Sequence, residues 1–118
     1  MRLIFLFVLA STFGTSTCYK KGAPSNIPKC IQSKIDSLQK APVQNPPAII
    51  TRYIYQGKKV YLFNAPCCDQ FSSLYNEDCV LICLPDGGIA GRGDGKCADF
   101  STAATDEKLL WQDLRIRN

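Results

Sequence analysis

The cysteines constrain the fold of this chain more than any other residue type does. Seven cysteines occur in 118 residues, and the chain has no histidine. At this density, cysteines in an exported chain predict a disulfide framework. Six of the seven follow residue 27, and an even number can pair completely. The six disulfide candidates are Cys30, Cys67, Cys68, Cys79, Cys83 and Cys97.

Local geometry limits how these cysteines can pair. Cys67 and Cys68 are neighbours, and Cα atoms joined by a trans peptide lie about 3.8 Å apart, which is tighter than unstrained disulfides allow. Cys79 and Cys83 would lie about 13 Å apart on one strand, which is too far. We therefore expect the members of each pair to bond to different partners. Zinc is not expected as a cofactor, because the chain lacks zinc-knuckle spacing and histidine.

The beginning of the chain predicts export. Met1-Arg2 supplies a minimal basic segment, and residues 3–10 form an unbroken apolar run that is followed by small residues. This pattern is typical of a secretory signal peptide, and the run is too short to span a bilayer. We expect a signal peptide over residues 1–17. The protein is then secreted, or located in the periplasm or cell envelope.

Cys18 stands at the boundary between this leader and the rest of the chain. A polar segment over residues 18–26 is expected to be a linker, and residues 27–118 are expected to form a single disulfide-rich domain. The alternative for Cys18 is lipidation, which would make the protein a membrane-anchored lipoprotein. The residues before Cys18 match the usual lipoprotein pattern poorly. Lipidation is the only expected contact with a membrane.

Periodicity predicts a helix at the start of the domain. Apolar residues recur at spacings of three and four between Ile27 and Leu38, which indicates one buried stripe. The helix is expected to start near residues 26–28, where proline costs nothing in the first turn, and to end at Ala41-Pro42. Cys30 lies on the stripe, so it is expected to tie the helix to the structure that it covers.

Alternation predicts an antiparallel sheet. Two β-rich runs, residues 49–55 and 59–64, flank Gln56-Gly57, which is a two-residue hairpin turn. A third strand is expected over residues 79–84, and a short helical turn over residues 70–75. The fold class is therefore α+β: an N-terminal helix packed on a small antiparallel sheet of three or four strands, stabilised by disulfides.

Two further expectations concern the disulfide partners of Cys30 and Cys97 and the structure of the C-terminal tail. Cys30 and Cys97 are expected to bond to the cysteines of the third strand or to the corner at Cys67 and Cys68. Thr105 is a plausible N-cap, so the tail is expected to form a helix that docks on the domain, with a final strand as the alternative.

The composition argues against several kinds of chemistry. Without histidine, neither a Ser-His-Asp triad nor Cys-His activation can form. The adjacent carboxylates Glu77-Asp78 and Asp106-Glu107 fit a turn and a helix start better than an acid–base pair. We therefore expect no enzyme activity, no catalytic residue and no cofactor. The net charge of +4 comes from scattered residues, so nucleic acid is not expected as a partner. A monomer that binds a protein or a glycan is expected.

Residues 86–97, "DGGIAGRGDGKC", hold five of the eight glycines. They do not form a phosphate-binding loop, because Ala90 and Cys97 replace the required glycine and hydroxyl residue. Cys97 also replaces the last ligand of a calcium-binding EF-hand, although Asp86 and Asp94 could form a looser calcium site. We expect a bent return loop that Cys97 ties to the core. The candidate recognition residues are Asp86, Arg92, Gly93, Asp94 and Lys96, of which Arg92 to Asp94 are expected to be the most exposed.

Several stretches of the chain resemble a known family. They are "YQGKKVYLFNAPCCDQF", "LYNEDCVLICLPDGGIAGRGDGKCADF" and "TDEKLLW". Together they are similar to an uncharacterised family of small exported bacterial domains with a CCDQF corner and a GxGDGKC loop. Members are described only as hypothetical proteins or lipoproteins, so the resemblance implies a structure rather than an activity. Cys79 departs from the pattern.

The expected function follows from these exclusions. The leading hypothesis is a non-catalytic exported domain with a binding or structural role. One alternative is a protease inhibitor, because the chain is small, exported and rich in cysteine. The other is an adhesive ligand that uses the Arg-Gly-Asp tripeptide, Arg92 to Asp94.

Overall fold

The structure is a computed structural model that describes residue 14 and residues 26–116. Apart from Gly14 and Asn26, the predicted signal peptide and linker lie outside the described residues, and so does Cys18. None of the described helices is long and apolar enough to cross a membrane.

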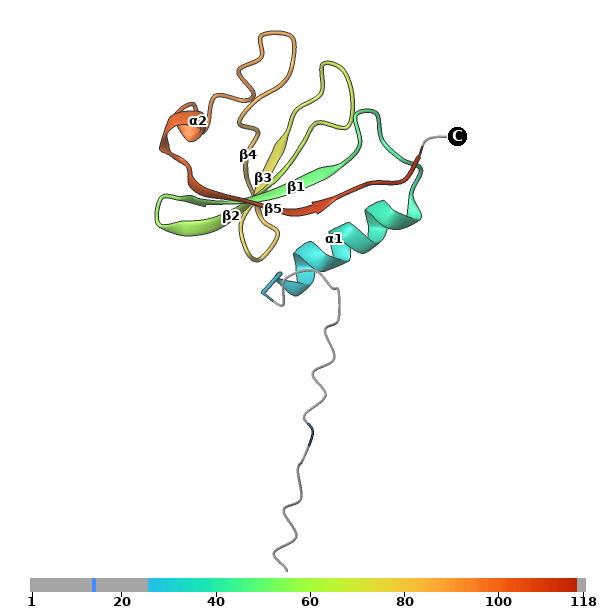
Figure 1. The fold of residues 1–118 in the computed structure, drawn as a ribbon. Coiled ribbons are helices and arrows are strands. Elements are labelled where there is room, and N and C mark those ends of the chain that lie inside the picture. Colours follow the sequence, from blue (N-terminus) through green and yellow to red (C-terminus); the bar gives the residue numbers. More distant parts are fainter. Residues whose placement is uncertain (1–13, 15–25, 117–118) are drawn as a thin grey trace, which may run out of the picture.

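The core of the fold is one antiparallel sheet of five strands in the order β4-β3-β2-β1-β5 (Figure 1). Strands β1 to β4 each pair with the next strand in the chain, and the last strand, β5, returns to pair with β1. The strands are β1 (Ile49–Tyr55), β2 (Lys58–Phe63), β3 (Ser73–Tyr75), β4 (Leu81–Cys83) and β5 (Thr105–Gln112).

Helix α1 (Lys29–Lys40) lies across one face of this sheet, and the loop after β4 and the short helix α2 (Phe100–Ala103) lie at the opposite side (Figure 1). The α+β class is therefore confirmed. The expected number of strands was too low, because the sheet has five strands instead of three or four. α1 begins at Lys29 and ends at Lys40. The backbone of the next residue, Ala41, is extended, and Pro42 follows it.

Two segments differ from expectation. Residues 73–75 form β3 rather than part of a helical turn, and residues 105–112 form β5 rather than a helix. Leu74 pairs with Leu62 of β2 and is fully buried. The residues next to Leu74 in the sequence do not predict this strand. The alternative of a final strand was the correct one for the tail.

The hairpin between β1 and β2 follows directly from the sequence. Tyr55 and Lys58 face each other at its end, and the two residues between them both have positive φ. Gln56 has φ of 52° and Gly57 of 73°. This geometry suits the twist of the flanking strands. The turn therefore fixes the register of the β1–β2 pair.

Alternate residues along β1 and β2 point to opposite faces and build two cores. On one face, Ile31 and Ile35 of α1 pack on Ile50 and Tyr61, and all four are at most 1% exposed. This contact uses the apolar stripe predicted for the helix. The other core, which lies under the loop after β4, consists of Tyr55, Val60, Leu74, Cys83, Cys97 and Phe100.

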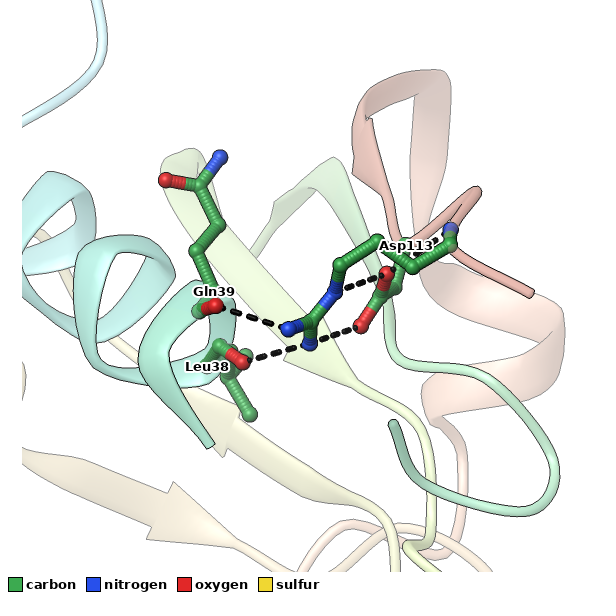
Figure 2. Close-up of polar contacts among 4 residues, drawn as sticks. Leu38, Gln39 and Asp113 are labelled. Atoms are coloured by element: carbon green, nitrogen blue, oxygen red, sulfur yellow. Dashed lines mark hydrogen bonds and ion pairs between the residues drawn. The ribbon is translucent and has the colours of Figure 1, made fainter. Parts of the chain in front are cut away.

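The last described residues return to α1. The backbone N–H of Asp113 donates to the carbonyl oxygen of Ala48, just before β1. Arg115 then reaches the end of α1, where its guanidinium meets the last carbonyl groups (Figure 2). The C-terminal segment thus connects the helix to the sheet.

Candidate functional site

Three cysteine pairs lie at bonding distance, and they differ in what they join. Cys83 of β4 pairs with Cys97, and their Cα atoms are 6.2 Å apart. Both residues are buried in the core beneath the loop after β4. This disulfide ties the end of the glycine-rich segment to the sheet, as expected of Cys97.

The second pair joins the helix to the sheet. Cys30, in the first turn of α1, pairs with Cys79 in the turn between β3 and β4, with Cα atoms 6.0 Å apart. Cys79 has φ of 58° and lies just before the short strand β4. Cys30 and Cys97 therefore both reach cysteines of the segment that was expected to be the third strand.

The third pair contradicts an expectation. Cys67 and Cys68 pair with each other, although they were expected to have different partners. The other four candidates are already paired among themselves, so within the described part of the chain neither neighbour has another cysteine to reach. Cys68 has φ of 50°, and the N–H of Gln70 donates to the carbonyl oxygen of Cys67 over 3.0 Å. The pair therefore belongs to a tight turn and forms at the short Cα separation of 3.8 Å that was expected to prevent it.

The glycine-rich segment is a folded loop fixed by its own backbone. The N–H of Gly93 donates to the carbonyl oxygen of Gly87 over 3.1 Å, and that of Asp94 to Leu84 over 2.9 Å. At Gly93, where φ is 61°, an added Cβ would overlap the carbonyl oxygen of Leu84 and lie 2.8 Å from the nitrogen of Asp86. No other residue fits such a position without displacing backbone. All five glycines of the loop have positive φ: Gly87, Gly88, Gly91, Gly93 and Gly95.

This loop packs against the turn that holds the adjacent cysteines. Gly87 forms a bridge with Phe71, and an added Cβ at Gly87 would lie 2.8 Å from the Cα of Phe71. The N–H of Ser72 donates to the carbonyl oxygen of Asp86 over 3.2 Å. Two segments that are separate in the sequence therefore form one surface. We call residues 67–71 and 86–96 together the loop surface.

The loop surface exposes two large apolar side chains. Ile89 is 96% exposed, and Phe71 is 40% exposed. Ile89 stands at the turn where the loop reverses, whereas the Arg-Gly-Asp tripeptide lies on the returning arm. On this arm Arg92 and Asp94 are exposed and Gly93 is partly buried, and the backbone hydrogen bonds of Gly93 and Asp94 hold the arm against the start of the loop.

The charged candidates of the loop surface have defined roles. Asp86, Arg92, Asp94 and Lys96 are all exposed, and Gly93 is partly buried. The Asp94 carboxylate accepts a hydrogen bond of 3.0 Å from the backbone N–H of Lys96. Asp94 thus stabilises the turn that leads to Cys97. Among the described residues, no three His, Cys, Asp or Glu side chains come together as a metal site.

A cleft of about 430 Å³ beside the loop surface was not predicted from the sequence. Tyr53 and Phe100 line it with Asp86 and Glu107, and the two rings meet edge to face at 5.2 Å. Tyr53 donates to the Glu107 carboxylate over 3.1 Å. Burial, together with this hydrogen bond and the charge of Glu107, raises the pKa of Tyr53. The contact of Tyr53 with Glu107 depends on the pairing of β1 with β5.

A comparison with known proteins gives one match. A family model described as a domain of unknown function, DUF6970, matches residues 36–113. The match begins within α1 and includes the whole sheet, the loop surface and Asp113. No curated protein and no solved structure matches the chain.

Proposed function

From the premise that the chain belongs to DUF6970, a family of domains of unknown function, we propose that it is a non-catalytic exported domain that binds another protein through the loop surface. The supporting observation is the exposed side chain of Ile89 on a loop whose backbone is fixed on both sides. A rigid loop loses little conformational entropy on binding, so its exposed side chains contribute more of their contact energy to affinity.

The chemistry of the loop surface favours a protein over a glycan. Ile89 is aliphatic and 96% exposed, and an aliphatic side chain of this kind gains free energy by entering an apolar pocket of a protein. Arg92 and Asp94 of the same loop are exposed and carry charges of opposite sign, which suit a polar interface rim. A glycan would be held by polar side chains and stacked rings, and Phe71 offers only part of one ring.

Export is supported by the cysteines and by the leader. Six cysteines form three pairs in the structure, and disulfides persist in oxidising compartments. The apolar run after Met1-Arg2 has the pattern of a signal peptide. We propose a secreted, periplasmic or cell-envelope location, with a lipid anchor on Cys18 as the alternative. Mass spectrometry of the mature protein, which identifies its first residue and any lipid, tests both.

The binding test uses one variant in the loop surface and a matched control. Ile89→Asp puts a charge at the centre of the proposed contact, whereas Leu114→Asp puts one at a distant side chain that is 82% exposed. The full chain is cross-linked in extracts of the source cells, and each captured protein is purified for an affinity measurement. We expect Ile89→Asp to weaken binding at least about ten-fold, which corresponds to about 1.4 kcal/mol, and Leu114→Asp to leave it unchanged. Equal affinities for both variants, or binding of glycans alone, would refute the proposal.

One alternative function is favoured by the same loop. A protease inhibitor needs a rigid, exposed segment that resists cleavage, and residues 86–96 are fixed by hydrogen bonds and by the Cys83–Cys97 disulfide. The test is the rate of representative serine and cysteine proteases at micromolar concentrations of the domain. Inhibition that is lost in Ile89→Asp would favour this function, whereas uninhibited proteases and a cleaved loop would exclude it.

A further inference from the structure

The three cysteine pairs do not contribute equally to the architecture. Cys83–Cys97 is buried and fixes the loop to β4, and Cys30–Cys79 joins segments that are 49 residues apart in the sequence. Cys67–Cys68 links two neighbouring residues, so it joins no separate elements. A bond between neighbours closes a very short loop and removes little entropy from the unfolded chain. Stabilisation of the fold therefore does not account for this pair.

The turn that carries the pair is held in place by other bonds. The N–H of Ala65, before the pair, donates to the hydroxyl oxygen of Ser72 over 3.2 Å. After the pair, the N–H of Gly88 donates to the carbonyl oxygen of Gln70 over 3.4 Å. These contacts do not involve either sulfur atom. We therefore expect the turn to stay attached to the domain when the disulfide opens, so that the pair is reduced and reoxidised without unfolding.

The two cysteine residues differ in exposure. Cys68 is exposed, whereas Cys67 is partly buried. An attacking thiolate needs access to a sulfur atom, and an exposed disulfide is more labile than a buried one. The structure therefore offers Cys68 to an incoming thiol and leaves Cys67 as the more protected leaving group.

We propose that Cys67–Cys68 is a thiol–disulfide exchange site whose substrate is an exposed thiol of a small molecule or of another protein. The thiolate of the substrate attacks the Cys68 sulfur, a mixed disulfide forms there, and Cys67 leaves as a thiolate. A second substrate thiolate attacks the substrate sulfur of the mixed disulfide and releases Cys68. Two thiols are thereby oxidised to one disulfide, and the protein disulfide is reduced to two thiols.

The first test compares the adjacent pair with the buried pair in one folded protein. The full chain, with Cys18 replaced by serine, is incubated with increasing concentrations of dithiothreitol, alkylated, and analysed by peptide mass spectrometry. We expect Cys67 and Cys68 to be alkylated at a concentration at least about ten-fold lower than Cys83 and Cys97, because exposed disulfides are the labile ones. Circular dichroism should show a folded domain at that point. Simultaneous reduction of both pairs, or unfolding when Cys67–Cys68 opens, would overturn the proposal.

The second test uses a pair of single-cysteine variants in the same Cys18→Ser background. Cys67→Ala leaves the exposed thiol of Cys68, and Cys68→Ala leaves the partly buried thiol of Cys67. Both are incubated with glutathione disulfide, and the rate of mixed-disulfide formation is measured by mass. We expect the Cys67→Ala variant to react at least about five-fold faster, because thiol access controls the rate. Equal rates would contradict the assignment of Cys68 as the attacked sulfur.

Two reductants show whether the substrate thiol belongs to a small molecule or to a protein. Reduced glutathione and a reduced dithiol protein of the thioredoxin type are offered to the wild-type pair. Reduction by glutathione indicates a small-molecule substrate, and reduction by the dithiol protein alone indicates a protein substrate. Reduction by neither would refute the exchange site. The glutathione reaction needs no protein partner, so a failure here is distinct from a failure of the proposed protein binding.

Discussion

Arg115 and Asp113 form a bidentate ion pair next to the C-terminal end of α1 (Figure 2). The Nε of Arg115 donates to Oδ1 of Asp113 over 2.9 Å, and Nη2 donates to Oδ2 over 2.7 Å. The same guanidinium donates to the carbonyl oxygens of Leu38 over 2.9 Å and Gln39 over 2.7 Å. These carbonyl groups lie in the last turn of α1, where helices lack internal donors and favour positive charge.

This geometry predicts that Arg115 cannot be replaced by another cation. Arg115→Ala leaves the carboxylate of Asp113, whose side chain is 3% exposed, without its charged partner, and it removes both donors to α1. Arg115→Lys keeps the charge but cannot form the two parallel hydrogen bonds. We expect the melting temperature to fall in both variants, and to fall further in Arg115→Ala. Unchanged melting of Arg115→Ala would show that the pair does not stabilise the fold.

The ion pair also predicts a loss of stability in acid. Hydrogen bonding to Arg115 lowers the pKa of Asp113 below its ordinary value of 3.8, against the opposing effect of burial. Because the folded-state pKa is the lower one, the contribution to stability is present above the unfolded-state pKa. It is lost as pH falls below about 4 towards the folded-state pKa. Urea unfolding as a function of pH should show this loss in the wild type and a smaller one in Asp113→Asn. Equal acid dependence in both proteins would contradict this assignment.

The sequence predicted the parts of the fold whose structure is determined locally. The β1–β2 hairpin follows from alternation and from Gln56-Gly57, whose positive φ values match the expected turn. The stripe of α1 follows from spacings of three and four. In contrast, β3 has only three residues, and it is a strand because Leu74 pairs with Leu62. A segment this short carries too little periodicity to reveal its type.

The tail shows that tertiary pairing can override a local signal. Thr105 and the acidic residues after it resemble the start of a helix, yet Thr105 pairs with Ile54 and Trp111 with Ile50. Without β5, β1 would be an edge strand with one side unpaired. The free backbone hydrogen-bonding groups on that side favour an extended partner. The pattern of the tail alone does not contain this information.

The candidate site was predicted in part. The glycines and Cys97 predicted a bent return loop that is tied to the core, and the structure has one. The contact between Gly87 and Phe71 joins two segments that no local pattern connects, so the loop surface emerged only from the fold. The adjacent cysteines were expected to have different partners because their Cα atoms lie only 3.8 Å apart, whereas they pair with each other in a turn where Cys68 adopts a left-handed conformation.

Two glycines of the loop provide a matched pair of variants. Both have positive φ, 61° at Gly93 and 77° at Gly95, but an added Cβ meets the backbone of Leu84 and Asp86 at Gly93 and open space at Gly95. Gly95→Ala should therefore cost only about 1–2 kcal/mol of unfolding free energy for the left-handed backbone. Gly93→Ala should cost about 1–2 kcal/mol more, because backbone must move. Denaturant unfolding measures both, and equal losses would show that the loop yields at Gly93.

The buried disulfide should stabilise the domain by a predictable amount. Cys83 and Cys97 are 14 residues apart, and closing a loop of about 15 residues contributes about 3 kcal/mol in the chain-entropy account. The double variant Cys83→Ala/Cys97→Ala avoids a free thiol and should lose about this much in urea unfolding. The corresponding double variant at Cys67 and Cys68 should lose much less, because neighbours close almost no loop. A reversed order would contradict the roles that we assign to these pairs.

Three tyrosines predict how stability changes in base. Burial is the first cause that raises the pKa of Tyr53 and of Tyr61, whereas a hydrogen bond to Asp99 is the first cause for Tyr55. A tyrosine whose folded-state pKa lies above its unfolded value of about 10 contributes stability that is fully present below pH 10. This contribution is lost as pH rises through the folded-state pKa. Unfolding should therefore become easier above about pH 10.

Tyr53 allows this prediction to be tested at a single residue. Tyr53→Phe removes the ionisable group, so the decrease in unfolding free energy above about pH 10 should become smaller. Glu107→Gln keeps the tyrosine but removes the carboxylate that accepts its hydrogen bond, so the pKa of Tyr53 should fall towards its ordinary value. Tyrosinate absorbance during an alkaline titration reports that pKa, and denaturant unfolding reports the stability. If neither variant differs from the wild type, the contact between β1 and β5 at Tyr53 and Glu107 does not form in solution.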